Sequence, residues 1–195
     1  MRVNVFTEIS NFSYGVFGKN IVLELNKNIE VCLAPAFHRL TGVEQSELAD
    51  IQKMLARIET IKFSDIGVIF ANGNQLFRCA AKQRIAYIQF FSDEINNDWL
   101  NQLKQVECIC VPSKWQADIL AKYNLKAVVI PPGVNINIFK PRKLESLNLN
   151  FNKDNKFRFF SVGKWDSRKN QGLALEAFCE EFSVDEPVQF YGMWH

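Results

Sequence analysis

The stretch RVNVFTEISNFSYGVFGKNIVLELNKNIEVCLA, residues 2–34, decides the fold. Residues 2–6 alternate polar and apolar side chains, as a strand does. Residues 17–27 place Phe17, Ile21 and Leu25 on one face of a helix, and residues 29–34 form a second apolar strand. A strand, a helix and a strand within 33 residues predict a βαβ crossover, whose strands pair in parallel.

The same alternation continues along the chain. Further strands are predicted at residues 66–71, 84–90, 107–111 and 127–130, with helices between them. The strand at 66–71 is a continuous apolar run, as buried parallel strands are. We therefore expect residues 1–141 to form a Rossmann-like, doubly wound α/β domain, with a parallel sheet and helices on both faces.

Three helix starts are predicted from polar caps. Thr41-x-x-Glu44 has the form of a capping box that begins a long helix. The expected buried stripe of that helix is Leu48, Ile51, Leu55 and Ile58. Asp98 and Ser113 are the predicted caps of two later helices.

A second, incomplete α/β domain is expected after a linker. Residues 142–156 are polar and rich in Asn and Lys, which is typical of a linker. A strand is predicted at 157–163, a helix at 170–182 and another strand at 188–191. A doubly wound domain usually needs about 100–150 residues. Residues 157–195 are therefore expected to supply only the start of such a domain.

The charge balance of the chain does not favour a strongly charged partner. The chain has 195 residues, with 23 Lys and Arg against 21 Asp and Glu, a net charge of +2. This balance gives no electrostatic argument for a nucleic-acid partner or an anionic membrane surface. The N-terminus lacks the apolar run of a signal peptide, and no run approaches the ~18 apolar residues of a membrane span. A cytoplasmic protein without a membrane span is predicted.

Five cysteines, at positions 32, 79, 108, 110 and 179, occur without a CxxC pair. An odd number of scattered cysteines favours free thiols in a reducing compartment. Cys108 and Cys110 share one face of a strand, which leaves a metal or disulfide site open beside the simpler interpretation of two core residues. His38 and His195 are isolated in the sequence and suggest no metal or catalytic site.

The segment VPSKWQADILAKYNLKAVVIPPGVNINIFKP, residues 111–141, is the most informative for function. It resembles the junction of the two domains in glycosyltransferases of the GT-B fold, in the large family 4-like group (glycosyl transferases group 1). Val111-Pro112-Ser113 and the run from Ile130 to Val134 fit the family pattern, and Asn135 stands where Asp is usual. The resemblance implies that Gly133 and Asn135 lie between the two domains of such an enzyme.

The segment FRFFSVGKWDSRKNQGLALEAFCEEF, residues 157–182, is similar to the first strand–loop–helix unit of the family's donor domain. By motif position Lys164 takes the place of Arg, Lys169 that of Lys, and Asn170 that of Gly. The resemblance implies that Lys164, Arg168 and Lys169 bind the donor diphosphate. Independently of the family, helix N-termini and nearby cations attract anions. The alternative interpretation, a solvated basic loop without a ligand, stays open.

Two further segments resemble parts of the family that face the cleft. In AYIQFFSDEINNDWLNQL, residues 86–103, Asp93 fits an acceptor-side position, whereas Phe91 replaces an acidic residue and cannot accept a proton. A solvated loop is equally open for Asp93. The glycine loop that contains Tyr14, Gly15 and Gly18 corresponds to a substrate loop, or to a simple turn before a helix. It lacks the dinucleotide fingerprint G-x-G-x-x-G.

The resemblance implies a retaining sugar transfer from a nucleotide-diphosphate donor to a hydroxyl group of a glycan or lipid. The nucleotide sugar is a substrate, and no cofactor or metal is implied. The family's base-binding and ribose-binding residues lie beyond this segment, so this chain alone is expected to be inactive, and a second chain that completes the donor domain is an expected partner. The alternative is a non-catalytic module that binds an acceptor or a protein partner.

Overall fold

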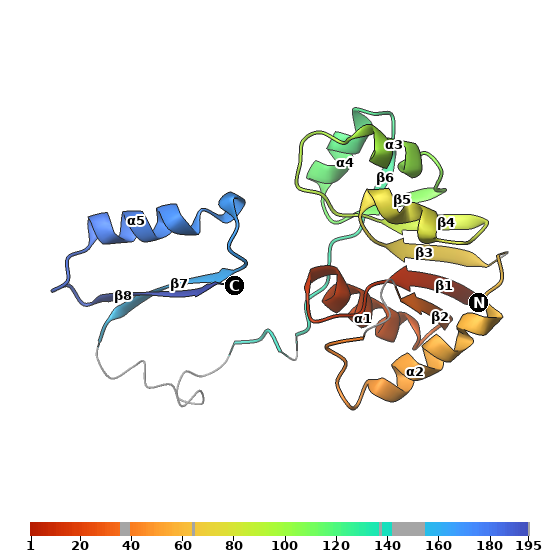
Figure 1. Cartoon of the computed structure of the whole chain (residues 1–195), viewed down its shortest axis with the longest axis horizontal. Helices are drawn as coiled ribbons and strands as arrows, with labels where there is room; N and C mark the ends of the chain where they lie inside the picture. The colour runs from red at the N-terminus through yellow and green to blue at the C-terminus, as the bar shows by residue number, and fades with distance from the viewer. Residues whose placement is uncertain (36–39, 64, 137, 142–154, 195) are drawn as a thin grey trace. The chain divides into compact units, whose positions relative to one another are not determined.

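The computed structural model describes residues 1–35, 40–63, 65–136, 138–141 and 155–194. The chain divides into two compact units, Met1–Val134 and Asn135–His195. The predicted linker at 142–156 falls almost entirely outside the described residues. Each unit is an α/β structure with parallel strands, as the sequence predicted, and Figure 1 shows the alternation of strands and helices along the chain.

The first unit is built on a six-stranded, all-parallel sheet. Its strands are β1 (Arg2–Thr7), β2 (Glu30–Pro35), β3 (Ile66–Phe70), β4 (Gln83–Tyr87), β5 (Cys108–Val111) and β6 (Ala127–Val129). Their order across the sheet is β2-β1-β3-β4-β5-β6 (Figure 1). The chain first places β2 on one side of β1 and then places β3 to β6 in order on the other side. The direction in which strands are added to the sheet therefore reverses at β1.

Helices cover both faces of this sheet, as expected. The helical segments are α1 (Ser13–Leu25), α2 (Leu48–Ala56), η1 (Arg57–Thr60), η2 (Gly73–Arg78), α3 (Asn97–Leu103) and α4 (Lys114–Ala121). Residues of α1 and α2 pack in one buried cluster with Val5, Leu33 and Phe70, whereas η2, α3 and α4 pack in another with Ile69. Neighbouring residues of a strand point to opposite faces, so these clusters lie on opposite faces.

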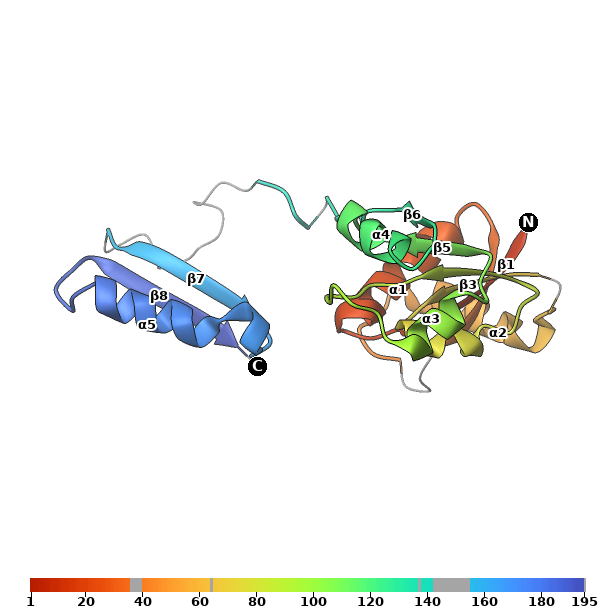
Figure 2. The same cartoon turned by 90° about the horizontal axis from the view of Figure 1, so that it is seen from above.

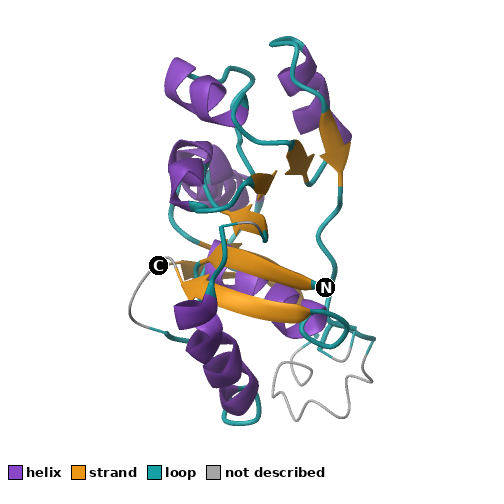
Figure 3. Ribbon diagram, turned by 90° about the vertical axis from the view of Figure 1, so that its right-hand side faces the viewer, coloured by secondary structure: helices purple, strands orange, loops and turns teal. Residues whose placement is uncertain are grey.

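The second unit has two parallel strands and one long helix. Strands β7 (Phe157–Gly163) and β8 (Val188–Trp194) pair along their whole length, and α5 (Gln171–Glu181) follows the short η5 turn (Ser167–Lys169). Figure 2 shows α5 along one face of the strand pair, and Figure 3 shows the same elements by type. Phe159 of β7 lies 5.5 Å, between ring centroids, from both Phe178 and Phe182. Edge-to-face and tilted aromatic contacts therefore hold the helix on this face.

The start of α2 differs from the prediction. The capping box at Thr41 is wrong, because the helix begins at Leu48 and the residue that closes the turn before it is Glu47. The Glu47 carboxylate accepts hydrogen bonds from the Glu44 backbone N–H (2.9 Å) and from the Lys19 ammonium of α1 (2.8 Å). Burial alone raises the pKa of Glu47, but these hydrogen bonds outweigh it and lower the pKa.

The predicted buried stripe of α2 is confirmed in part. Ile51 is buried and Leu55 is half-buried, but Met54 is also fully buried and Ile58 is 44% exposed. Ile58 leaves the buried face because the α-helix ends at Ala56. The chain continues as the tighter η1 turn, which changes the spacing from 3.6 to 3.0 residues per turn.

Of the two later helix caps that the sequence predicted, one is confirmed and the other is wrong. Ser113 is confirmed as the cap of α4, since its hydroxyl accepts a hydrogen bond from the Gln116 N–H (3.4 Å). The cap of α3 is Asn96 rather than Asp98, because Asn96 is extended and its side-chain oxygen accepts from the Trp99 N–H (2.9 Å). Asp98 lies in the first turn, where its charge is favourable to the helix dipole.

All five cysteines are free thiols, as predicted. Cys108 and Cys110 have their sulfur atoms 3.9 Å apart on β5, at the distance of a thiol–thiol hydrogen bond, and form no disulfide. The part of the chain that the structure describes holds no group of three His, Cys, Asp or Glu side chains that would suit a metal ion. None of the helices within the described ranges has the length and apolarity that a membrane crossing requires.

The thiols are expected to react with iodoacetamide in a fixed order at mildly alkaline pH. Burial raises the pKa of Cys79 to about 11 and that of Cys110 to about 12. Because the thiolate is the reactive form, these two residues should stay unlabelled in the folded protein while the exposed Cys179 is labelled first. Mass spectrometry of timed digests measures this order, and Cys179→Ser should remove the fast label. Rapid native labelling of Cys110 would contradict the burial described here.

Candidate functional site

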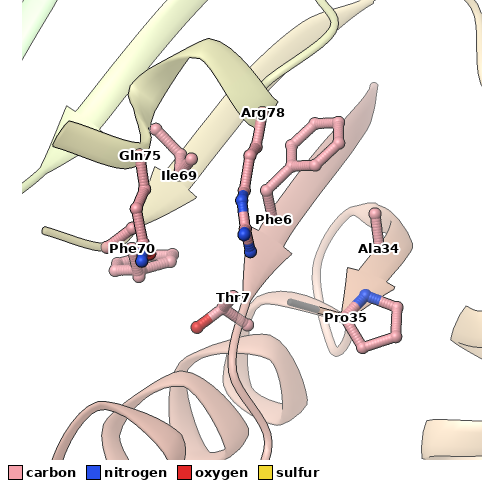
Figure 4. Close-up of a pocket in the computed structure, with 9 residues that line it drawn as sticks. Phe6, Thr7, Ala34, Pro35, Ile69, Phe70, Gln75 and Arg78 are labelled. Atoms are coloured by element: carbon pink, nitrogen blue, oxygen red, sulfur yellow. The ribbon is translucent and has the colours of Figure 1, made fainter. Parts of the chain in front are cut away.

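A hollow of about 360 Å³ lies at the carboxyl ends of β1, β2 and β3 (Figure 4). Its lining residues come from these three strands, from the residue that follows β3 and from η2: Phe6, Thr7, Ala34, Pro35, Ile69, Phe70, Ala71, Gln75 and Arg78. The direction in which strands are added to the sheet reverses at β1, so the hollow lies at the topological switch point. Open parallel sheets commonly bind ligands at this point.

Strand register places the lining in two rows. Ala34, Phe6 and Ile69 are aligned across β2, β1 and β3, and they share the face opposite the α1–α2 cluster. Pro35, Thr7 and Phe70 make the next row, at the ends of the strands. The first row gives the hollow an apolar floor, and the small Ala34 side chain beside Phe6 leaves space above β2.

The hollow is open because η2 is short and lies toward α3. Gly73, the first residue of η2, packs so closely that an added Cβ would lie 2.4 Å from Trp99 of α3. This contact holds η2 on the α3 side of the sheet face. A six-residue 3₁₀ segment between β3 and β4 covers less of the sheet than a full crossover helix would.

Polar groups enter the hollow from η2. Figure 4 shows the Arg78 side chain extending from η2 past Phe6 toward Thr7, with the Gln75 amide on the side of Phe70. The Arg78 guanidinium also lies 6.0 Å from the centroid of the Phe77 ring. The Thr7 hydroxyl donates to the Glu8 carbonyl (3.3 Å). An apolar floor with a guanidinium and an amide at one side suits a small ligand with one anionic end.

The predicted glycine loop is part of helix α1. Tyr14 and Gly15 lie in its first turn and Gly18 in the second, so they are not loop residues. An added Cβ on Gly15 would lie 2.4 Å from the Ser10 backbone nitrogen, and one on Gly18 would lie 2.1 Å from the Thr7 hydroxyl oxygen. The glycines therefore let α1 approach the end of β1, and neither is among the residues that line the hollow.

Tyr14 fixes the start of α1 to the segment after β4. Its hydroxyl donates to the Gln89 carbonyl (3.0 Å) and accepts from the Gln89 N–H (2.9 Å). Burial raises the pKa of Tyr14 to about 12, so the hydroxyl keeps the proton that it donates. The sequence analysis placed Tyr14 in a substrate loop or a turn before a helix. In the structure, Tyr14 joins the first turn of α1 to the segment that follows β4.

Five other residues considered in the sequence analysis either do not line the hollow or fall outside the described residues: Asp93, Gly133 and Asn135 in the first case, and the two histidines in the second. Asp93 is exposed, in the segment between β4 and α3, and it is not among the residues that line the hollow. Gly133 has no heavy atom within 4 Å of an added Cβ, so the structure shows no close approach that requires glycine there. The Asn135 carbonyl accepts hydrogen bonds from the N–H groups of Ile138 (3.1 Å) and Phe139 (2.9 Å). His38 and His195 lie outside the described residues.

The second candidate site is the basic turn between β7 and α5. Lys164, Arg168 and Lys169 all lie on this turn and are exposed. Gly163 ends β7 with φ of 142°, a conformation that favours glycine, and an added Cβ there would lie 2.5 Å from the Lys169 ammonium nitrogen. Asn170 precedes α5 in the left-handed conformation, with φ of 51° and ψ of 38°.

Two side chains that the sequence analysis did not select hold this turn in shape. Gln171 is 3% exposed, and its amide donates to the Lys164 carbonyl (2.7 Å) and accepts from the Asp166 N–H (3.4 Å). The Asp166 carboxylate accepts from the Arg168 N–H (2.9 Å). The three cations are thus carried on a turn whose backbone is braced at both ends.

Comparisons with protein-family models, with curated proteins and with solved structures found no match to this chain. The fold establishes a Rossmann-like parallel α/β domain followed by a small second parallel sheet. The geometry of the two sites is therefore what bears on function.

The role assigned to Gly18 can be tested against a matched glycine. Gly18→Ala is expected to destabilise the first unit by about 1–3 kcal/mol, because the new methyl group must displace Thr7 and the Glu8 carbonyl. Gly133→Ala, with open space around the new methyl group, should change stability by less than about 0.5 kcal/mol. Urea unfolding followed by circular dichroism measures both. Equal stabilities of the two variants would show that the close approach of α1 is not required.

Proposed function

We propose that the chain belongs to a glycosyltransferase of the GT-B type, in which the β7–α5 turn binds the diphosphate of a nucleotide-sugar donor. The sugar would pass to a hydroxyl group of a glycan or lipid acceptor. The single observation that carries the proposal is the shape of this turn: three cations on a braced loop between a parallel strand and the N-terminus of α5.

The conformation at Asn170 supports the resemblance where the sequence departs from it. In the family pattern this position is Gly, and the structure gives Asn170 a left-handed backbone. Asn is among the few residues other than Gly that adopt this conformation readily. Asn170 therefore adopts a backbone conformation that glycine would also adopt readily.

Electrostatics at the turn suits a diphosphate. The first N–H groups of a helix have no partner within the helix and carry partial positive charge, so they attract anions. Lys164 is the first residue of this turn, and the Lys169 ammonium lies over Gly163 at the end of β7. In a transfer reaction these cations would offset the negative charge that develops on the leaving diphosphate. Each lysine acts as a point charge, without the two-pronged contact of arginine.

The proposed place of the reaction is the cytoplasm. All five cysteines are free thiols, which supports a reducing compartment. The glycan or lipid acceptor, the nucleotide-sugar donor and a second chain that completes the donor domain also belong to this proposal.

Binding of uridine diphosphate and of inorganic pyrophosphate to the full chain tests the proposal. Calorimetry should detect binding of both, weaker at higher salt, because the contacts are between exposed charges. Lys169→Ala and Lys164→Ala should each weaken binding by about fivefold to tenfold, the range expected for an exposed charge-assisted contact. Amide shifts in nuclear magnetic resonance spectra should centre on residues 163–172.

Lys156→Ala is the matched control, because it removes the same charge just before the amino end of β7. It should leave the affinity unchanged within about twofold, the limit of a long-range charge effect at moderate salt. If Lys156→Ala weakens binding as much as Lys169→Ala does, the turn is not a specific site. Absence of any binding of either anion would also contradict the proposal.

A further inference from the structure

A second ligand site is indicated by the hollow at the switch point of the first unit. It shares no residue with the β7–α5 turn, and its lining was not selected by any motif of the sequence. The inference below is independent of the proposed sugar transfer, since it rests on the hollow alone.

The size of the hollow fits a small molecule. Its volume of about 360 Å³ is at the lower end of the range of about 300–1,000 Å³ found for ligand pockets. A hollow of this size admits a small ligand such as a substituted benzene ring.

The lining divides by chemistry into a floor and a polar side. Phe6, Ala34 and Ile69 form the aligned apolar row, which can cover the flat or branched body of a ligand. Arg78 and Gln75 project from η2 on one side only. A guanidinium presents paired N–H donors to a carboxylate or phosphate, and the NH₂ of the Gln75 amide adds a second donor group.

We propose that this hollow binds a small ligand with an apolar body and a single carboxylate or phosphate group, with the body on the Ala34–Phe6–Ile69 row and the anionic group at Arg78. The same chemistry would be offered by an aromatic or aliphatic acid and by its phosphate analogue. The apolar row gives affinity for the body, and the position of Arg78 at one side orients the ligand.

The experiment uses the full ¹⁵N-labelled chain with three probes that share a phenyl ring: benzoate, phenyl phosphate and the neutral benzamide. Amide shifts are followed in nuclear magnetic resonance spectra. The anionic probes should give saturable shifts at Thr7, Ala34, Ala71 and Gln75, and benzamide should bind at least tenfold more weakly. Inorganic phosphate, which has no apolar body, should also bind at least tenfold more weakly than phenyl phosphate.

Two variants assign the roles within the hollow. Arg78→Gln should weaken binding of benzoate at least tenfold and bring it to the level of benzamide. Ala34→Leu should weaken all three probes, because the new side chain occupies the space on the floor. Lys82→Gln, which removes one exposed charge at the opposite end of β4, should leave all affinities within twofold.

The outcomes separate this site from the diphosphate site. Shifts confined to residues 163–172 would overturn the inference and leave the proposed diphosphate site intact. Equal binding of benzoate and benzamide, or an affinity that Arg78→Gln does not change in a variant whose spectrum stays dispersed, would also overturn it. Absence of saturable shifts for every probe in the first unit would do the same.

Discussion

The hydrogen bonding of β1 to β2 on one side and to β3 on the other is the constraint on which the first unit depends. Because all three strands run parallel, their carboxyl ends meet at one edge, and the chain leaves this edge in two directions. The register then sets Phe6 level with Ala34 and Ile69. A slip of one residue in either pair would turn the slipped strand's member of this row to the opposite face and break the floor of the hollow.

Close approach of α1 to β1 completes this edge. Gly15 and Gly18 present no side chain to the backbone of residues 7–10, so the helix starts directly above the strand end. Tyr14 then ties the helix to Gln89, which follows β4 on the far side of β3. Contacts between segments distant in sequence, such as Tyr14 with Gln89, therefore fix the edge of the sheet that carries the hollow.

The strands and the class of fold could be predicted from the sequence, because alternating and continuous apolar runs such as residues 2–6 and 66–71 reflect burial in a sheet. Helix starts were less certain. Ser113 was found because a single polar residue precedes the helix, but at α2 several polar residues compete and Glu47 is selected by its contact with Lys19, 28 positions earlier. Such a contact has no local signal. The hollow was missed for the same reason: Ala34, Phe6 and Ile69 meet only when the strand order is known, and Arg78 has no motif around it.

The basic turn of the second unit was found from its motif, whereas its brace was not, since Gln171 is a polar residue that the helix buries at its first position. Trp165 lies within this turn, between Lys164 and Asp166, and its ring is 5.2 Å from that of Trp194 at the end of β8. The Trp194 ring is in turn held by a hydrogen bond from its N–H to the Ser161 hydroxyl (3.0 Å). Two indole rings at this separation couple their electronic transitions, and the coupling depends on their mutual angle of 70°. The turn therefore carries its own optical reporter, because any rearrangement of its backbone rotates Trp165 against a fixed partner and changes the ultraviolet circular dichroism of the pair.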